Sequence, residues 1–354
     1  MVVICWEMLP VYAARAIGAF VRLCDDEVRV LRVPSKRFCS VGTSEMTGCP
    51  VMDVERNDQR TIAEVVGKVP EAIVAGGWAS PCFMRWAKEV RKRGGRTIVT
   101  SDEAFTKKSL KQFIRKWRFR LLIAPLFDKV FVVGAGGKKH FIDYYGLSPE
   151  RVFTGLYGSD PKLFFNGPAL KERPKRFIYV GHYDANKNVI PMCEAFEMAV
   201  AQMGEAGSGW SLEVYGGGEL EESLRKRESE HVHIHGFIQA EQLGPLYRDS
   251  RGFVLGSFSD KWGVVVHEAA ASGCMLLLSS GVGARYDFAR EENAVIFNPA
   301  SVESFAEGFA KLMSKRDDEL VAAQETSVRL AQDFSPEIFA LNLKSALEEL
   351  NVRV

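Results

Sequence analysis

The sequence lacks the features that mark secreted, zinc-binding and membrane-spanning proteins. Its seven cysteines contain no C-x-x-C pair and no regular spacing, which favours buried thiols in a reducing compartment over a disulfide framework or a zinc site. No apolar run approaches the roughly 20 residues that span a bilayer. The N-terminal segment has no basic stretch and is interrupted by Glu7 and Arg15, so it predicts a strand and a helix rather than a signal peptide. We therefore expect a cytoplasmic protein, or one that lies peripherally on the inner face of a membrane.

The glycine-rich motifs of the commonest nucleotide-binding proteins are also missing. The chain has no G-x-G-x-x-G with an acidic residue at the right distance, and GAGGKKH (134–140) lacks the spacing of a phosphate-binding P-loop. The run Gly216, Gly217 and Gly218 is interpreted as a tight turn near the nucleotide, of low specificity. Glycine motifs alone therefore do not identify a nucleotide site in this chain.

What the chain does contain is a regular alternation of strand and helix patterns. Its 354 residues, 47% hydrophobic and 26% charged, fit two soluble globular domains. Short apolar runs predict buried strands at 2–5, 28–33, 72–77, 97–101 and 129–134, and near 176–181, 211–215, 252–256 and 275–279. Helical patterns lie at 11–24, 80–93, 105–124, 188–203, 219–228, 240–248, 302–313 and 334–350. Such alternation is typical of parallel sheets in α/β domains.

The net charge of +1 conceals two halves of opposite charge. Residues 1–170 carry 27 Lys and Arg against 17 Asp and Glu, whereas residues 171–354 carry 19 against 28, so we expect different partners for each half. The basic residues are densest at Lys107, Lys108, Lys111, Arg115, Lys116, Arg118 and Arg120. The interleaved apolar residues fall on one helical stripe, namely Leu110, Phe113, Ile114, Trp117 and Leu121.

The stretch from Lys107 to Arg120 has two interpretations, and both stay open. A basic face beside an aromatic and apolar face fits a helix that lies on an anionic membrane surface. Alternatively, the stripe packs on its own domain and the charges are solvated. Nucleic acid binding is disfavoured, because the other half is acidic and no nucleic-acid motif accompanies the basic patch.

The most informative segment is SFSDKWGVVVHE (257–268), in which Asp260 lies eight positions before Glu268. Gly263 and the β-branched run after it predict a loop that enters a helix partway along. Free backbone N–H groups at such a helix N-terminus suit a phosphate, and they would belong to Gly263, Val264 and Val265. Glu268 could accept two hydrogen bonds from a vicinal diol such as ribose, and Asp260 could hold another hydroxylated ring. The layout indicates a nucleotide-sugar site.

Five blocks of the second half resemble, in order, the retaining GT-B glycosyltransferases of family 4, the glycosyl transferases group 1. They are RFIYVGHYDANKN (176–188), LEVYGGGELEESL (212–224), VHIHGFIQAEQLGPLYRDSRGFVLGS (232–257), DKWGVVVHEAAASGCMLLLSS (260–280) and GVGARYDFAREENAVIFNP (281–299). The resemblance implies an α/β protein of GT-B fold, with two Rossmann-like domains facing across a cleft. It places the acceptor-side domain at 1–165, the nucleotide-sugar domain at 174–334, and a helix that crosses back to the first domain at 335–354.

The resemblance also implies roles for individual residues. Lys187 matches the lysine that grips the donor diphosphate, and His182 stands where the family usually has arginine, which puts the strength of phosphate binding in question. Glu268 matches the ribose-binding glutamate. Asp260 replaces the first glutamate of the family's E-x7-E motif, so donor choice would differ from relatives with the longer side chain. Positions where the family's main chain approaches the base or nucleotide correspond to Gly236, Phe237 and Gly217.

The first domain matches the family less well. Relatives place a histidine at its active-site edge, but this chain has no histidine before His140, and WEMLP (6–10) replaces the usual glycine pair after the first strand. Asp102 falls at about the position of the missing histidine and could orient the acceptor or contact the donor sugar. Alternatively, Asp102 caps the following helix.

Three alternating histidines, His231, His233 and His235, would share one face of a strand and could in principle hold a metal. The corresponding family segment is a plain strand and its members generally need no metal, so we expect none.

The resemblance implies a retaining, metal-independent glycosyltransferase without a cofactor. It would move a sugar from UDP- or GDP-sugar to a glycan or a lipid-linked acceptor, as in surface polysaccharide, lipopolysaccharide or glycolipid synthesis. Asp260, Glu268, Lys187 and Asp102 are the expected catalytic residues. Two alternatives remain: a catalytically weak homologue that acts as a binding or scaffold subunit, and an NAD-type oxidoreductase.

Overall fold

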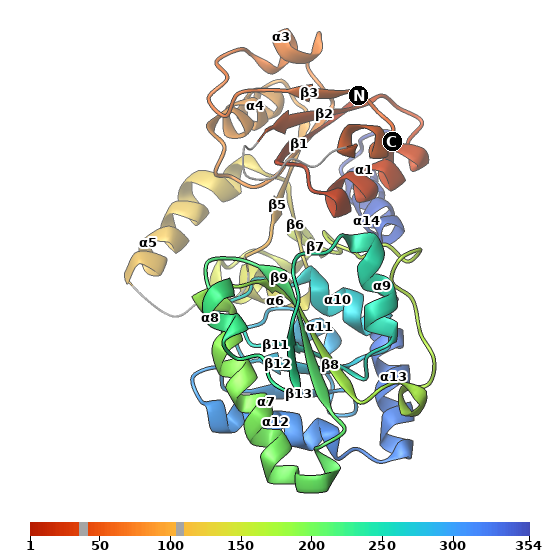
Figure 1. Cartoon of the computed structure of the whole chain (residues 1–354). Helices are drawn as coiled ribbons and strands as arrows, with labels where there is room; N and C mark the ends of the chain where they lie inside the picture. Colours follow the sequence, from red (N-terminus) through yellow and green to blue (C-terminus); the bar gives the residue numbers. More distant parts are fainter. Residues whose placement is uncertain (35–41, 104–109) are drawn as a thin grey trace. The chain divides into compact units, whose positions relative to one another are not determined.

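The computed structural model describes residues 1–34, 42–103 and 110–354. The chain forms two compact units: unit 1 comprises Met1–Gly158 and Phe334–Val354, and unit 2 comprises Ser159–Asp333. Unit 2 is therefore an insertion between two parts of unit 1 (Figure 1). The sequence places the domains at 1–165 and 174–334, and the last helix, which it sends back to the first domain, belongs to unit 1.

Unit 1 contains a seven-stranded parallel sheet in the order β3-β2-β1-β4-β5-β6-β7. Its strands are β1 (Val2–Glu7), β2 (Val28–Val33), β3 (Val51–Asp53), β4 (Ala72–Ala75), β5 (Arg96–Ser101), β6 (Lys129–Val132) and β7 (Val152–Thr154). The central strands β4 and β6 are buried along their whole length, as expected for a parallel sheet that is covered on both faces. The sequence analysis missed β3 and β7, which are only three residues long.

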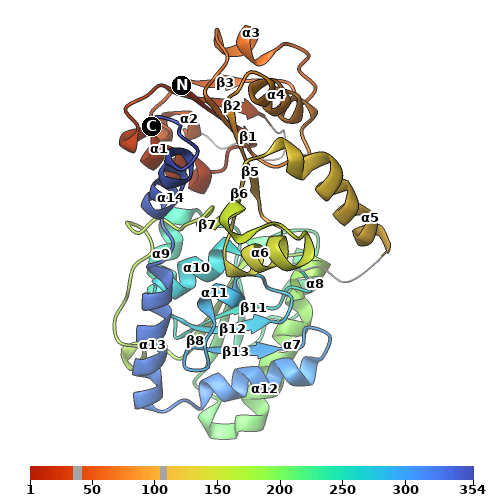
Figure 2. The same cartoon turned by 180° about the vertical axis from the view of Figure 1, so that it is seen from behind.

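Helices cover both faces of this sheet (Figures 1 and 2). On one face α1 (Val11–Leu23) packs against α14 (Pro336–Glu348), and Phe339 of α14 stacks on Phe131 of β6 with ring centroids 5.1 Å apart. On the other face lie α3 (Ile62–Val66) and α4 (Pro81–Lys92), which share one core with the aromatic residues that follow α5. The other helical segments are α2 (Thr43–Met46), α5 (Leu110–Arg118), Phe119–Ile123, Ala124–Leu126, α6 (Ala135–Lys139), His140–Tyr144 and Pro149–Arg151.

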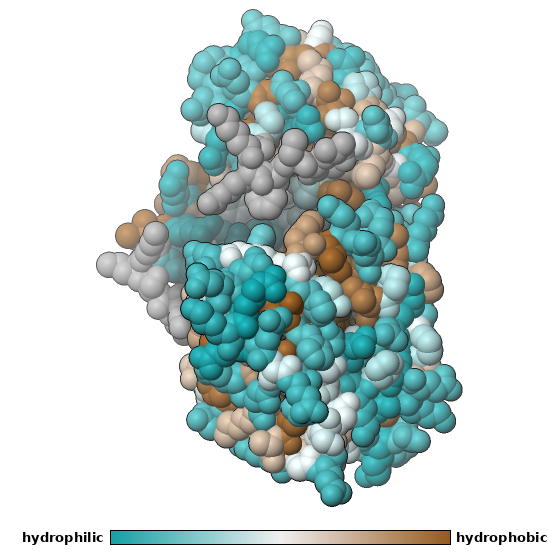
Figure 3. Space-filling view, viewed as in Figure 1, coloured by the Kyte–Doolittle hydropathy of each residue, from teal (hydrophilic) through white to brown (hydrophobic). Residues whose placement is uncertain are grey.

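Five apolar side chains of helix α5 and of the π-helical turn that continues it are exposed to solvent, whereas Phe119 of that turn is buried. The exposed fractions are 57% for Phe113, 61% for Ile114, 44% for Trp117, 67% for Leu121 and 63% for Leu122. In Figure 3, apolar surface lies over this helix at the left edge of the view. Phe113, Ile114, Trp117 and Leu121 of the stripe are thus not packed into the core of unit 1. Lys107 and Lys108 lie outside the described residues.

Unit 2 contains a six-stranded parallel sheet in the order β10-β9-β8-β11-β12-β13. Its strands are β8 (Arg176–His182), β9 (Ser211–Gly217), β10 (Val232–Ile234), β11 (Gly252–Leu255), β12 (Met275–Ser279) and β13 (Ala294–Phe297). The strand order reverses between β8 and β11. In an open parallel sheet, a ligand binds at the carboxyl ends of the strands at such a switch point.

Two pairs of helices cover the faces of this second sheet (Figures 1 and 2). On one side α7 (Val189–Met203) packs on α12 (Val302–Met313), and on the other α10 (Val264–Ala271) packs on α13 (Asp317–Ala331). The shorter helices are α8 (Glu221–Arg225), α9 (Ala240–Arg248) and α11 (Arg285–Phe288). The sequence analysis missed α13, because this helix buries Gln324 and Ser327 and so has an interrupted apolar stripe.

Within the part of the chain that the structure describes, no helix has the length and apolar character needed to cross a bilayer.

Candidate functional site

Two loops of unit 2 meet at the switch point, one after β8 and one after β11. The main-chain N–H of Phe258 donates to the carbonyl of Asn186 at 2.8 Å. The Asn186 side chain donates to the carbonyl of Ser259 at 2.9 Å and accepts from the Ser259 N–H at 3.1 Å. These bonds fix the register of the two loops, so the side chains that the loops carry have fixed positions relative to each other.

The loops bring Lys187 and Asp260 together, two residues that the family resemblance assigns separately to the donor site. Lys187 Nζ lies 2.6 Å from Asp260 Oδ2, and the two side chains are only 20% and 14% exposed. Asp184 holds the Lys187 main-chain N–H at 2.9 Å. The Asp260 N–H donates to Gly281, and the Asp260 carbonyl accepts from Gly283. The sequence did not predict that this cation and this carboxylate would pair with each other.

Helix α10 begins where the sequence predicts it, directly after Gly263. Gly263 has a φ of 83°, a left-handed conformation that glycine adopts more readily than other residues. Among the described residues, no acceptor is found for three main-chain N–H groups at this helix start, those of Gly263, Val264 and Val265. Free N–H groups together with the positive end of the helix dipole suit an anion.

Glu268 lies one turn deeper in α10. Burial raises the pKa of its carboxyl to about 7, and a hydrogen bond from Tyr247 partly opposes this rise. The donor is the Tyr247 hydroxyl, 3.2 Å from Glu268 Oε2. A carboxylate with this pKa is only partly ionised near neutral pH, so its ability to accept hydrogen bonds from a diol depends on pH.

His182 is the last residue of β8 and is exposed. Its carbonyl accepts from the Tyr179 hydroxyl at 2.8 Å, and its ring has no hydrogen-bond partner among the described residues. On the neighbouring strand β9, Gly216 is opposite Gly181 and has φ 151°, and a Cβ there would lie 1.8 Å from the Gly181 carbonyl oxygen. The glycine turn at the end of β9 therefore permits a close approach of the two strand ends, and His182 pairs with Gly217 there.

The loop after β10 carries the two residues expected beside the base. The Gly236 carbonyl accepts from the Gly216 N–H at 3.2 Å, which ties this loop to the glycine turn. The Phe237 side chain is 74% exposed, the highest value among the large apolar residues described. Such a ring offers a free face next to the strand ends.

The alternating histidines do not form a shared ligand set. His233 Nδ1 and His235 Nε2 both contact the buried carboxylate of Glu213, at 3.0 and 2.7 Å, whereas His231 Nδ1 contacts the carbonyl of Trp210 at 3.2 Å. Burial raises the pKa of Glu213, but the hydrogen bonds from His233, His235 and Ser211 outweigh it and the net shift is downward. In residues 1–34, 42–103 and 110–354, no group of three or more His, Cys, Asp or Glu side chains is arranged so that it could hold a metal ion.

In unit 1, Asp102 follows β5 at the carboxyl edge of the sheet. Two half-buried tyrosines feel its charge: burial raises the pKa of Tyr12 to about 12 and that of Tyr157 well above its usual value, and the charge of Asp102 adds to both shifts. Residues 104–109, which follow Asp102, lie outside the described residues, so the capping role of Asp102 stays a prediction. The histidine that the sequence offers, His140, is buried, and burial lowers its pKa to about 4.

The switch point of unit 1 lies between β1 and β4. In place of the family's glycine pair, Met8 and Leu9 both have positive φ, 68° and 45°. The Met8 N–H donates to the Val33 carbonyl at 2.9 Å and the Leu9 N–H to the Glu7 carbonyl at 2.9 Å, which hold this conformation. Non-glycine residues in this region are strained by roughly 1–3 kcal/mol each and cluster at functional sites.

Two neighbours of Glu268 were not predicted from the sequence, Tyr247 and His267, the latter 1% exposed. In the loop after β11, the buried hydroxyl of Ser257 has no hydrogen-bond partner among the described residues. His267 Nδ1 accepts from the Ser159 N–H and His267 Nε2 contacts the Ala331 carbonyl, both at 2.9 Å. A polar residue inside the apolar run VVVHE was the only sign of this role.

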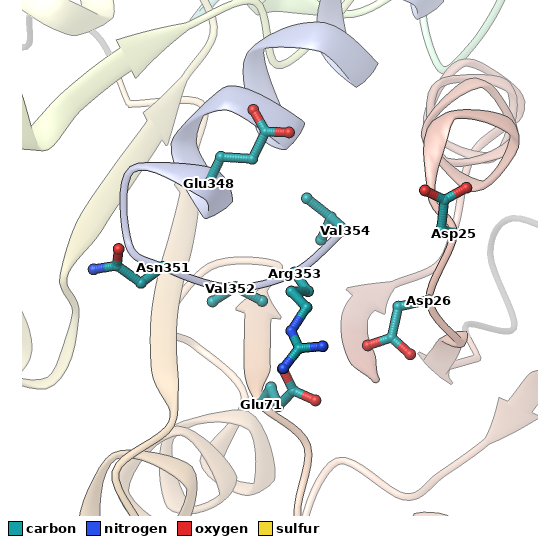
Figure 4. Close-up of a pocket in the computed structure, with 8 residues that line it drawn as sticks. All are labelled: Asp25, Asp26, Glu71, Glu348, Asn351, Val352, Arg353 and Val354. Atoms are coloured by element: carbon teal, nitrogen blue, oxygen red, sulfur yellow. The ribbon is translucent and has the colours of Figure 1, made fainter.

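A hollow of about 920 Å³ in unit 1 is not part of this site (Figure 4). It opens at the amino ends of β2 and β4, whereas ligands of parallel sheets bind at the carboxyl ends. Its lining consists of Asp25, Asp26, Glu71, Glu348, Asn351, Val352, Arg353 and Val354.

The comparison with protein families agrees with this geometry. A sequence profile described as Glycosyl transferases group 1 matches residues 161–329, which is nearly all of unit 2. Unit 2 is a glycosyl transferases group 1 domain. The strand order, the Lys187–Asp260 contact and the position of Glu268 are thus features of a domain from this family.

Solved structures show that the whole chain has the GT-B fold of glycosyltransferases. A glycosyltransferase from Rickettsia africae matches with a TM-score of 0.74 and 12% identity over 99% of this chain and 98% of that one. Sucrose-phosphate synthase from Thermosynechococcus elongatus matches with a TM-score of 0.71 and 14% identity over 99% of both chains. HepE from Anabaena in complex with UDP matches with a TM-score of 0.75 and 13% identity over 98% of this chain and 99% of that one. A comparison with curated protein sequences finds no match.

Proposed function

We propose that this protein is a retaining glycosyltransferase that moves a sugar from a nucleotide-sugar to a glycan or a lipid-linked acceptor. The observation that carries the proposal is the convergence at one switch point of Lys187, Asp260, Glu268 and the free N–H groups at the start of α10.

Each of these groups has a plain task in that reaction. The Lys187 ammonium and the N–H groups of α10 would stabilise the diphosphate as negative charge develops on it. Glu268 would accept hydrogen bonds from the ribose diol, and Asp260 from a hydroxyl of the transferred sugar. No protein nucleophile is needed when the acceptor hydroxyl attacks the face that the nucleotide leaves and the departing phosphate takes the proton. The proposal includes no metal and no cofactor.

The nature of the donor is supported by printed descriptions of similar structures. HepE from Anabaena was solved with UDP and glucose, and a pneumococcal O-GlcNAc transferase with UDP and GlcNAc. A further match is a lipopolysaccharide outer core galactosyltransferase, WaaB. We therefore propose UDP- or GDP-sugar as donor and a surface polysaccharide or glycolipid as product.

The test is a binding and hydrolysis screen with UDP-, GDP- and ADP-sugars. We expect tight binding of one of them, and Glu268→Gln should abolish it while leaving thermal unfolding close to that of the wild type. Failure of every sugar nucleotide to bind would refute the proposal, and binding of NADH instead would favour an oxidoreductase.

A catalytically weak homologue is the second candidate, because His182 replaces the arginine of the family and its ring has no partner in the described part of the chain. This alternative predicts donor binding without transfer or slow hydrolysis. Restoring the family residue by His182→Arg would then raise hydrolysis, whereas an active enzyme would change by only a few-fold.

We further propose that the protein works at the inner face of a membrane and binds it through α5. The exposed stripe of Phe113, Ile114, Trp117, Leu121 and Leu122 would enter the headgroup region, while the cations of the same helix face anionic lipid. Arg118 and Arg120 are exposed and suited to this contact.

Vesicle flotation tests the membrane proposal. The protein should float with vesicles that contain phosphatidylglycerol and not with pure phosphatidylcholine, and the pair Ile114→Asp and Leu121→Asp should remove flotation. Leu341→Asp is the matched control, since Leu341 is 52% exposed on α14. Equal recovery with neutral and anionic vesicles would contradict the proposal.

A further inference from the structure

Tyr247 is held in one position by the core of unit 2. The residue is 0% exposed and lies near the end of α9. Its ring lies edge-on to Phe164 and Phe253, with centroids 5.9 and 6.0 Å away. Its carbonyl accepts from Cys274 Sγ at 3.2 Å. Both the backbone and the ring are therefore fixed, and the hydroxyl has one direction available to it.

That hydroxyl donates to Glu268 Oε2 at 3.2 Å. Burial raises the pKa of Tyr247 well above its usual value, so the phenol keeps its proton and remains a donor throughout the neutral range. The second carboxylate oxygen, Glu268 Oε1, has no hydrogen-bond partner in the described part of the chain. One oxygen is thus occupied by the protein and the other is available to a ligand.

We infer that Tyr247 is a positioning residue for the nucleotide: it anchors one oxygen of Glu268 so that the other meets the ribose diol. The inference rests on the proposed function. A glutamate side chain rotates about three bonds, and an anchor on one oxygen removes that freedom before the ligand arrives. The fixed ring of Tyr247 supplies such an anchor at no cost of its own ordering on binding.

The hydrogen bond has a second effect that a purely structural tyrosine would not have. It favours the ionised form of Glu268, whose pKa burial raises to about 7. Without the hydroxyl, Glu268 would keep its proton up to a higher pH. As the pH is lowered, a protein without this hydroxyl should therefore lose donor affinity at a higher pH than the wild type, because a protonated carboxyl accepts hydrogen bonds from the diol poorly.

Tyr247→Phe tests this with the sugar nucleotide that the wild type binds best in the UDP, GDP and ADP series. Titration calorimetry should show roughly tenfold weaker binding at pH 8, the expected effect of one lost bond to a charged group. The pH at which affinity is half lost should move upward. The kcat should change less than the KM, because the tyrosine touches no reacting atom.

The 2′-deoxy form of the same nucleotide makes the test specific. Tyr247→Phe should have little further effect on its binding, since the diol that Glu268 recognises is incomplete. Tyr145→Phe is the matched control: Tyr145 is a buried tyrosine of unit 1 whose hydroxyl donates to Glu103 Oε2 at 2.7 Å. It removes the same kind of bond and should leave nucleotide affinity and its pH dependence unchanged.

The outcomes separate this inference from the proposed function. Absence of sugar-nucleotide binding by the wild type would overturn both. Wild-type binding that Glu268→Gln abolishes, but that Tyr247→Phe leaves unchanged in strength and pH dependence, would overturn the inference alone. An equal loss for the ribose and 2′-deoxy nucleotides would also overturn it.

Discussion

The two units have the same strand order around their switch points, yet different chemistry stands there. In unit 2 the loops after β8 and β11 carry a paired cation and carboxylate, Lys187 and Asp260. In unit 1 the loop after β1 carries no charge at its tip and instead holds Met8 and Leu9 at positive φ. Topology determines where each site lies, and only the loop residues determine what the site can bind.

The difference also follows the charge of the two halves. Unit 2 comes from the acidic half but concentrates its free N–H groups and Lys187 where an anion would bind. Unit 1 comes from the basic half and exposes cations and apolar side chains on α5. A nucleotide donor in unit 2 and an acceptor with an anionic or lipid part in unit 1 would use these surfaces.

Lys187→Met removes the cation of the unit 2 switch point. Because the lysine would offset charge on the leaving diphosphate, we expect kcat/KM to fall about a thousandfold, or about 4 kcal/mol. Steady-state kinetics with the preferred donor measure it. Lys226→Met, at an exposed lysine directly after α8, is the control and should change little. A fall of less than about threefold would remove Lys187 from the proposed site.

His267→Leu tests what supports the helix that carries Glu268. Burial lowers the pKa of His267 to about 4, below the ordinary 6.5, so the folded state binds fewer protons than the unfolded state below pH 6.5. The contribution of neutral His267 to the free energy of unfolding is therefore fully present above pH 6.5. As the pH falls from 6.5 to 4, the free energy of unfolding decreases by up to about 3 kcal/mol.

The variant should therefore be less stable than the wild type at pH 7, because the Ser159 N–H and Ala331 carbonyl lose their partner, and the gap should narrow towards pH 4. Hydrogen exchange of unit 2 peptides at both pH values measures this difference in stability between the variant and the wild type. Unit 1 peptides are the internal control, since His140 there also has a pKa of about 4 and is unchanged in the variant. A gap that widens in acid would contradict this account.

Gly263→Ala strains the start of α10. A side chain at φ 83° costs roughly 1–2 kcal/mol, and the new Cβ would lie 3.2 Å from Leu255 Cδ2. We expect the free energy of unfolding to fall by that amount in denaturant titrations. Gly209→Ala has only Lys175 Cδ at 3.7 Å and should be close to neutral. Equal effects of the two substitutions would argue against a special role for this turn.

Met8→Gly removes the backbone strain of a non-glycine residue at the switch point of unit 1. Glycine adopts positive φ without steric cost but loses more entropy on folding, so we expect a gain of at most about 1 kcal/mol in the free energy of unfolding. Thermal unfolding measures it. Met46→Gly is the control, because Met46 is similarly exposed on α2 and should lose stability. Destabilisation by Met8→Gly would mean that the side chain, and not the backbone, holds this loop.

The sequence predicted most of the framework, because long apolar strands and periodic helices leave clear patterns. It predicted that α10 starts after Gly263, since a glycine before a β-branched run is a local cue. It failed at β3 and β7, which are too short to show a period, and at α13, whose buried face contains Gln324 and Ser327.

The site was predicted less completely, because its contacts join distant parts of the chain. Lys187 and Asp260 are 73 positions apart, and no spacing rule indicates that they form an ion pair. Tyr247 and His267 resemble ordinary core positions until the structure shows their partners. The positive φ of Met8 and Leu9 could not be predicted from the sequence, since neither residue type favours that conformation.

The insertion of unit 2 within unit 1 has a consequence for the protein during its synthesis. Unit 2 is a continuous segment, Ser159–Asp333, and can fold once it has left the ribosome, whereas unit 1 waits for α14. At roughly 5–20 residues per second, the wait lasts on the order of 10–35 seconds. Throughout this interval the apolar face of α1, including Ile17 and Phe20, is without the helix that covers it in the finished protein. The nascent chain is therefore open to chaperones at α1 during this interval.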